Sequence, residues 1–380
     1  KLRPSISWLY VFLPVTVLLD KVGSVPAPVI FFSAALSIIP IASLIVHSTE
    51  QLAARTGDAV GGLLNATFGN APELIISLVA LKAGNHELVR ASIIGAILAN
   101  LLLAVGVSFC LGGLRYHTQE YNPGALRVYS TMMLLAVFSI AIPSAFNRFF
   151  SGNAVMRQEQ LLNVGLAVVL LVAYGLYLVF MLKTHTDAFR SVSPDNSEHG
   201  PRWSAGRAAG SLVAASVLAA WMSEILVGAA EGTGHALGMS QTFIGIVFVA
   251  IVGGAAESGS AIAMARKNKM DLSLSVAFGS SIQIALFVAP LLVLASYFLG
   301  PQPMDLSFTR AEVGSLFIAV LIGAFVSGDG SANWYKGVQL VTMYAIIALM
   351  FYFLPEAGPE STGQIWGGPG GGASSIAPGG

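Results

Sequence analysis

Long apolar runs separated by short polar segments constrain the fold of this chain more than any other feature. Only 10% of its 380 residues are charged and 55% are hydrophobic, whereas about 25% of the residues in a typical soluble domain are charged. A helix needs about 20 consecutive, mostly apolar residues to cross the hydrocarbon core of a bilayer. The pattern therefore predicts an all-α polytopic membrane protein that is embedded in a lipid bilayer.

We predict eleven transmembrane helices from these runs. They cover residues 8–19, 29–54, 59–81, 88–111, 125–145, 161–182, 208–230, 243–265, 274–299, 313–326 and 338–354. Most of the 19 lysines and arginines then fall in loops on the side of the N-terminus. Because cytoplasmic loops are enriched in these residues, we expect a cytoplasmic N-terminus and central loop, and a C-terminus that is outside or lumenal. The membrane itself is either a plasma membrane or a vacuolar-type membrane.

The longest polar stretch divides the chain into two halves. We predict a first peripheral span over 1–27, an N-terminal five-helix repeat over 28–185, a cytoplasmic linker over 186–206, a C-terminal five-helix repeat over 207–357 and a disordered tail over 358–380. The tail is glycine-rich and cannot bury an apolar surface. The first apolar run also fits a signal peptide, but we favour a short span.

A helix-breaking sequence followed by an acid lies inside the third run. In the stretch GNAPE at residues 69–73, Pro72 lacks an N–H group and disfavours helix at the residue before it. Glu73 then falls in the first turn of a new half-helix, where the helix dipole favours negative charge. A charge at the bilayer centre costs about 2.5–3.5 kcal/mol on insertion scales, so Glu73 is a candidate functional residue.

The second half of the chain repeats this pattern. A shift of 184 residues, which takes Glu73 to Glu257, also takes Gly95 to Gly279 in the following span. The two glutamates are five spans apart, so their spans cross the membrane in opposite directions. Inverted repeats of this kind are common in secondary transporters, which bind their substrates near the membrane midplane.

Polar residues near the two glutamates are placed to complete a cation site. The candidate ligands are Glu73 and Glu257 for the metal ion or protons, with Asn70, Asn100, Ser280 and Gln283 as further oxygen ligands. Carboxylate, amide, hydroxyl and carbonyl oxygens suit a calcium-sized ion better than a soft metal. The alternative is that the neutral side chains only join helices through hydrogen bonds.

Three further acids, Glu50, Glu224 and Glu231, lie nearer the ends of their spans. They are candidates for recruiting cations at the two mouths of a pathway, and the alternative is that they are solvated acids at the interface. The only cysteine, Cys110, excludes an intramolecular disulfide and a cysteine-rich metal site. A net charge of zero gives no indication of nucleic-acid binding, so we expect no nucleic-acid partner.

The antiparallel pair of motifs favours a transporter over a channel, which needs a continuous pore. The late spans lack the deep lysine of a retinal protein. They also lack the Ser–Lys, paired-Asp or His–metal arrangement of an intramembrane enzyme. We therefore expect no enzymatic activity and no cofactor. An oligomer is compatible with the sequence.

Three stretches resemble motifs of the cation/proton exchangers (CAX type) of the Ca2+/cation antiporter superfamily. They are LNATFGNAPELII at 64–76, GSSIQIALF at 279–287 and GDGSANW at 328–334, and the similarity covers nearly the whole chain. The resemblance implies eleven spans, with one peripheral span and two inverted five-span repeats. It also implies exchange of cytosolic Ca2+ for protons by alternating access, with Glu73 and Glu257 as the central cation and proton ligands. The alternatives are Na+- or K+-coupled cation/Ca2+ exchange, and Na+/H+ or Mn2+/H+ antiport.

The chain departs from this family pattern in its second half. The family usually has GNAAEH where this chain has GGAAES at 253–258, so an amide is missing at Gly254 and an imidazole at Ser258. The acidic segment that the family carries between its halves is nearly absent. We therefore expect the two halves to ligate a cation differently.

Overall fold

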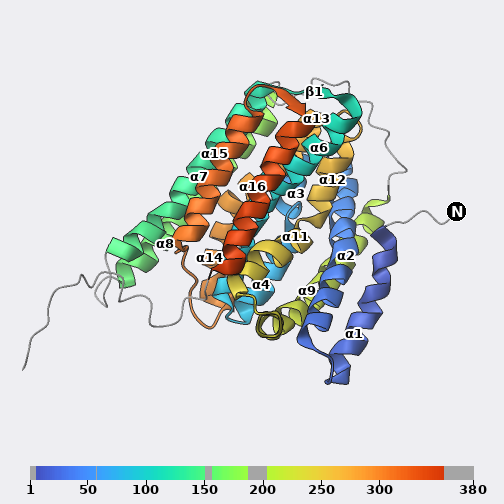
Figure 1. The fold of residues 1–380 in the computed structure, drawn as a ribbon, viewed down its shortest axis with the longest axis vertical. Coiled ribbons are helices and arrows are strands. Elements are labelled where there is room, and N and C mark those ends of the chain that lie inside the picture. The colour runs from blue at the N-terminus through green and yellow to red at the C-terminus, as the bar shows by residue number, and fades with distance from the viewer. Residues whose placement is uncertain (1–5, 57, 150–155, 187–202, 355–380) are drawn as a thin grey trace, which may run out of the picture.

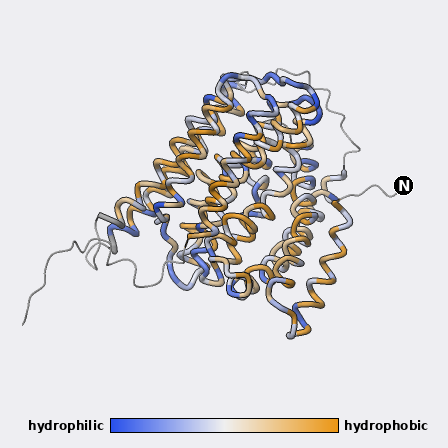
Figure 2. The backbone as a smooth tube through the Cα atoms, in the orientation of Figure 1, coloured by the Kyte–Doolittle hydropathy of each residue, from blue (hydrophilic) through white to orange (hydrophobic). Residues whose placement is uncertain are grey.

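The structure is a computed structural model that describes residues 6–56, 58–149, 156–186 and 203–354. Most of the predicted linker and all of the predicted tail lie outside these residues. The described part is helical almost throughout, as predicted (Figure 1). Hydrophobic residues cover most of the length of the helices, and hydrophilic residues gather at their ends (Figure 2).

The described elements of the first half begin with a short 3-10 helix and include two π-helical segments. In chain order they are η1 (Ile6–Val11), α1 (Phe12–Val22), α2 (Ala27–Thr56), α3 (Asp58–Phe68), α4 (Ala71–Lys82), α5 (His86–Leu98), η2 (Ala99–Ala104), α6 (Val105–Tyr116), β1 (Thr118–Glu120), α7 (Pro123–Phe149), α8 (Met156–Val179) and η3 (Phe180–Thr184). The π-helical segments are η2 and η3.

The described elements of the second half follow a similar order. They are α9 (Ala205–Leu237), α10 (Gln241–Phe243), η5 (Ile244–Val249), α11 (Ala250–Gly253), α12 (Ala255–Ala265), α13 (Met270–Gln283), η6 (Ile284–Val288), α14 (Ala289–Leu299), α15 (Arg310–Ser327), β2 (Ser331–Asn333) and α16 (Trp334–Phe353). Here η5 and η6 are π-helical.

Helices occupy all of the predicted spans. By length and hydropathy, 8 helices of the described chain can cross a membrane, and up to 9 if the bent pair Gln241–Gly253 and Ala255–Ala265 is one span. The remaining predicted spans, 8–19 and 59–81, hold α1 with η1 and α3 with α4, and each of these helices is shorter. The structure thus establishes a multi-pass helical membrane protein.

The ends of the helices follow local sequence chemistry. Gly23 and Gly238 end α1 and α9 with φ of 69° and 67°, a conformation that glycine adopts without steric cost. Thr309 and Glu312 form a reciprocal capping box at the start of α15. Pro40 lies inside α2, which continues on both sides of it.

The helices form one layered bundle. The long helices α2 and α9 pack against each other, and α1 lies at the edge of the molecule against α2 (Figure 1). At the opposite edge lie α7, α8 and α15, and α15 packs on α7. The helices that carry the two glutamate motifs lie between these edges: α4 packs on α9, and α12 packs on α2, α6 and α13.

A small antiparallel ribbon was not predicted. Strand β1 pairs with β2, with Gln119 opposite Ala332. The side-chain amide of Gln119 also donates hydrogen bonds to the carbonyl of Ala265 and to Asn268 at 2.9 Å. The ribbon thus ties together three loops that we expect on the cytoplasmic side.

Candidate ion-binding site

Two breaks in the helical backbone position the two central glutamates. Between α3 and α4, Asn70 has φ −97° and ψ 30°, and Glu73 falls in the first turn of α4. Between α11 and α12, Gly254 has φ −81° and ψ 13°, and Glu257 falls in the first turn of α12. Both breaks lie where the sequence predicted them, and each places a carboxylate near the positive end of a helix dipole.

Glu73 lies directly against the second break. A methyl group on Gly253 would lie 3.0 Å from Cγ of Glu73, and one on Gly254 would lie 3.5 Å from its Oε1 atom. The methyl group on Gly254 would also lie 3.7 Å from Oδ1 of Asn100. The two motifs therefore meet in the folded chain.

A hydrogen-bonded network joins the first break to the second half of the chain. The hydroxyl group of Ser280 donates to Oδ1 of Asn70 at 2.6 Å and accepts from the amide of Asn100 at 2.9 Å. All of these side chains are buried. Ser280 therefore connects two of the amides that the sequence singled out, and fixes their orientation.

Gln283 is the remaining candidate ligand, and it lies beside the first break. A methyl group on Gly69 would lie 3.5 Å from Oε1 of Gln283. The Nε2 atom of Gln283 is buried and has no hydrogen-bond partner among the described residues. All six predicted ligands, from Asn70 to Gln283, are buried. Their roles as ligands stay predictions.

The carboxylates of Glu73 and Glu257 lack donors. Both oxygens of each are buried, and none accepts a hydrogen bond from another residue in the described part of the chain. Leaving a buried charge unpaired is costly, so such oxygens are suited to a cation or to protons. Within the described residues no group of three or more His, Cys, Asp or Glu side chains could hold a metal ion. A cation here would therefore use neutral oxygens besides the two carboxylates.

A cavity of about 340 Å3 reaches Glu257 from one side. Asn70, Ser280 and Gln283 line it together with Glu257, and Glu50 lies along the same cavity. Glu73 is not among the residues that line it. The end of α2 that carries Glu50 is the end that we expect in the cytoplasm. The two glutamates thus differ in their access to this cavity.

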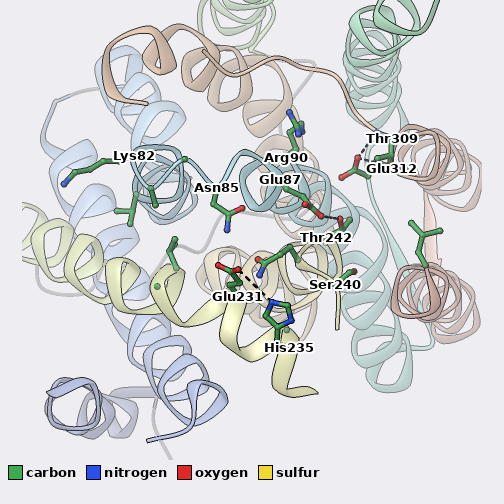
Figure 3. A pocket seen from close by; sticks show the side chains of 18 of the residues that line it. Lys82, Asn85, Glu87, Arg90, Glu231, His235, Ser240, Thr242, Thr309 and Glu312 are labelled. Carbon is green, nitrogen blue, oxygen red and sulfur yellow. Dashed lines mark hydrogen bonds and ion pairs between the residues drawn. The ribbon is translucent and has the colours of Figure 1, made fainter. Parts of the chain in front are cut away.

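A larger cavity of about 930 Å3 is lined by residues at the end of α4, the start of α5 and the second half of α9 (Figure 3). Glu224 and Glu231 line it, as do Glu87 and Arg90 at the start of α5. Glu87 accepts a hydrogen bond of 2.6 Å from the hydroxyl of Thr242, which links the two halves across the cavity (Figure 3). Neither central glutamate lines this cavity.

The three outer acids are placed at the cavities but are well exposed. The side chains of Glu50, Glu224 and Glu231 are 56%, 58% and 78% exposed. Each has a basic side chain 3.7 to 3.9 Å away, and exposed pairs at such distances contribute little to stability. These positions suit both interpretations of the three acids, namely recruitment of cations at the mouths of a pathway and solvated acids at the membrane interface.

Sequence reasoning missed two features of the site. Tyr129, Tyr174 and Tyr177 line the 340 Å3 cavity, and their only sequence signal is an aromatic residue within an apolar run. The π-helical turns η2 and η6 contain or directly follow the candidate ligands Asn100 and Gln283. Such turns are frequent at functional sites, but no residue pattern announces them.

Buried carboxylates at helix breaks in a multi-pass membrane protein, with a cavity that reaches one of them, are features of an integral membrane ion transporter. A comparison with protein families agrees with this class. The chain belongs to the sodium/calcium exchanger protein family, whose model matches residues 26–183 and 207–353.

Similar curated proteins are antiporters and exchangers by name. The chain is 42% identical over 342 residues to the Ca2+/H+ antiporter ChaA of Bacillus subtilis, which covers 88% of this chain and 96% of the relative. It is 41% identical over 345 residues to a Ca2+/H+ antiporter of Aphanothece halophytica, covering 86% and 90%. It is also 36% identical over 359 residues to vacuolar cation/proton exchanger 2 of Oryza sativa, covering 92% and 82%.

Solved structures share the fold. The structure of native YfkE matches with a TM-score of 0.77 and 38% identity, over 91% of this chain and 100% of that chain. The H+/Ca2+ exchanger CAX matches with a TM-score of 0.64 over 91% of each chain. Its identity is 13%, so this second match shows the fold alone.

Proposed function

We propose that this chain is a secondary active antiporter that exchanges cytosolic Ca2+ for protons. The observation that carries the proposal is the pair of buried glutamates, Glu73 and Glu257, whose carboxylate oxygens have no donors among the described residues. Membership of the exchanger family and the names of relatives that are 41% and 42% identical support Ca2+ and protons as the exchanged ions.

The mechanism is competition for the two carboxylates. A divalent cation binds when both are ionised, with Asn70, Asn100, Ser280 and Gln283 supplying neutral oxygens around it. Protonation removes the charges and releases the cation, because an unpaired carboxylate in a dry site is more stable when neutral. The cavity that reaches Glu257 supplies access from one side.

We infer that the chain crosses the membrane eleven times, with one peripheral span and two inverted five-helix repeats. The 184-residue shift supports the repeats, because it takes the π-turn η2 onto residues 283–288, which contain η6. The same shift takes α5 onto residues 270–282, within α13. The distribution of basic residues supports a cytoplasmic N-terminus, so the 340 Å3 cavity faces the cytoplasm.

The test is transport in proteoliposomes with an imposed pH gradient. We expect uptake of Ca2+ that follows the gradient, and comparison with Mn2+ and Na+ uptake establishes the selectivity. Glu73→Gln and Glu257→Gln should each abolish exchange, because either substitution removes a charge that the cation needs. Glu120→Gln, at an exposed position on β1, is the matched control. Ca2+ uptake that is independent of the pH gradient, or wild-type exchange in either central variant, would reject the proposal.

A further inference from the structure

Aromatic and apolar side chains form one wall of the 340 Å3 cavity. Tyr174 and Tyr177 lie one helical turn apart on α8, and their ring centroids are 6.2 Å apart. Tyr129 of α7 joins them in lining the cavity. We call these three residues the tyrosine wall. Leu178 and Met181 lie beside it and line the same cavity.

The rings of the tyrosine wall are held in place by their neighbours. The ring of Tyr174 packs on that of Phe287 with centroids 5.6 Å apart, and the ring of Tyr129 stacks on that of Phe278 at 6.2 Å. The hydroxyl group of Tyr177 donates a hydrogen bond to Met181 in the next turn. A ligand that binds against these rings therefore does not have to order them first.

The charged residues that line this cavity are acidic. They are Glu50 and Glu257, and no lysine, arginine or histidine lines the cavity among the described residues. The side chain of Glu257 is 6% exposed, and neither of its carboxylate oxygens has a hydrogen-bond partner in the described chain. A buried carboxylate without a partner at the wall of a cavity favours a cationic ligand.

The tyrosine wall indicates what kind of cation the cavity can take besides a metal ion. Ca2+ is bound by oxygen ligands, and a tyrosine ring offers its face rather than further carboxylates or amides. Organic cations are attracted to the faces of aromatic rings. The volume of about 340 Å3 falls within the range of pockets that hold small organic molecules, about 300–1,000 Å3.

We propose that this cavity binds a monovalent organic cation that carries an apolar group, of the arylalkyl guanidinium class. The guanidinium head pairs with the Glu257 carboxylate, which it fits through two parallel hydrogen bonds. The apolar group lies against the tyrosine wall. The bound ligand occupies the cavity through which Glu257 is reached, so it competes with Ca2+ for this carboxylate. The competition rests on the proposed antiport, whereas the binding does not.

Calorimetric titration of the full chain in detergent, without Ca2+, tests the binding. The probe is benzylguanidinium. Benzylurea has nearly the same shape without the charge, and guanidinium has the same charge without the apolar group. We expect saturable binding of benzylguanidinium and much weaker binding of the other two. No binding of benzylguanidinium, or equal binding of benzylguanidinium and benzylurea, would overturn the proposal.

A substitution of each partner locates the ligand. Glu257→Gln should weaken benzylguanidinium binding by about 10–150-fold, the range of a hydrogen bond to a charged group. Glu224→Gln is the matched control, because Glu224 lines the 930 Å3 cavity instead. Unchanged binding in Glu257→Gln, or equal weakening in both variants, would refute the assigned position of the guanidinium head.

The tyrosine wall is tested in the same titration. Tyr174→Leu should weaken binding by about 2–30-fold, the range of a cation–π contact, whereas Tyr174→Phe keeps the ring and should retain binding. Tyr344→Leu is the matched control, since Tyr344 is a buried tyrosine of α16 that is absent from the walls of this cavity. Tyr177→Leu repeats the test at the second ring of α8. Unchanged binding in both Tyr174→Leu and Tyr177→Leu, or equal weakening in Tyr344→Leu, would refute the role of the wall.

Transport in proteoliposomes tests the competition. Benzylguanidinium on the side from which Ca2+ is taken up should raise the KM for Ca2+ and leave the maximal rate unchanged. A lower maximal rate with an unchanged KM would refute competition at Glu257. A wild-type protein without proton-driven Ca2+ uptake would reject the proposed function, while the calorimetric titration would still decide whether the organic cation binds.

Discussion

Gly254 offers the sharpest test of how the second half differs from the first. Asn70 occupies the corresponding position in the first motif, and its side chain bonds to Ser280. A methyl group on Gly254 would make only ordinary contacts, at 3.4 Å from the carbonyl oxygen of Ala250 and 3.5 Å from Oε1 of Glu73. We therefore expect Gly254→Asn to fold and to place its amide beside the Glu73 carboxylate.

The expected gain in stability has two parts. The backbone of Gly254, at φ −81° and ψ 13°, suits an L-residue. Replacing glycine at such a position stabilises by about 0.4–1 kcal/mol, chiefly through the unfolded chain, and Gly254→Ala isolates this part. At a pH at which Glu73 is ionised, a hydrogen bond to its carboxylate contributes about 1.5–3 kcal/mol. Ordering the asparagine side chain costs up to about 2 kcal/mol. We expect Gly254→Asn to exceed Gly254→Ala by about 1 kcal/mol.

The measurement is equilibrium unfolding of the purified protein in detergent, combined with a double-mutant cycle. The extra gain of asparagine over alanine should disappear in a Glu73→Gln background if it comes from the bond to the carboxylate. An N-terminal capping effect of asparagine would instead survive that background. An asparagine variant no more stable than the alanine variant, or a gain that Glu73→Gln leaves intact, would refute the placement of Glu73 against Gly254.

Two further predictions follow from the described contacts. Ser280→Ala removes the hydroxyl that bonds to Asn70 and Asn100. It should lower the free energy of unfolding by about 1–3 kcal/mol and weaken Ca2+ binding in a titration. Partial burial raises the pKa of Asp329, but the hydrogen bonds from Lys336 and Ser331 and the charge of Lys336 together outweigh burial and hold that pKa below 3.8. Its contribution to stability is therefore complete above pH 3.8 and is lost as pH falls through the lower folded pKa. The melting temperature of the wild-type protein should therefore fall as the pH is lowered through this range. The melting temperature of Asp329→Asn should lack this part of the decrease.

The positions of the helices could be predicted from the sequence because the bilayer imposes a simple requirement. A span must be long and apolar, and its backbone must be satisfied within the helix, so hydropathy alone locates it. The break at Asn70 could be predicted as well, because Pro72 lacks the N–H that a continuous helix would use and is favoured in the first turn of a new helix. The β-ribbon could not, since Thr118–Glu120 and Ser331–Asn333 are far apart in the chain and too short to show a strand pattern.

The candidate site was only partly predictable, because some of its features depend on contacts between residues that are far apart in the chain. Scarce acids in apolar runs draw attention to Glu73 and Glu257 without any structure. The bridging role of Ser280 depends instead on three helices meeting, which no local pattern encodes. The difference in access between the two glutamates also depends on the conformation of the chain, and Glu257 alone lines the 340 Å3 cavity.

The two adjacent glycines of the second motif differ in what the fold demands of them. A methyl group added at Gly253 would lie 3.0 Å from Cγ of Glu73. A side chain at this position would therefore displace the carboxylate. Gly254 has ordinary clearance on every side, so packing does not explain its lack of a side chain. The missing amide therefore leaves room beside Glu73 and Asn100, where a bound cation can keep a water molecule as a ligand, as calcium sites often do. A site of this kind would receive no side-chain amide from the second motif, whereas the first motif carries Asn70.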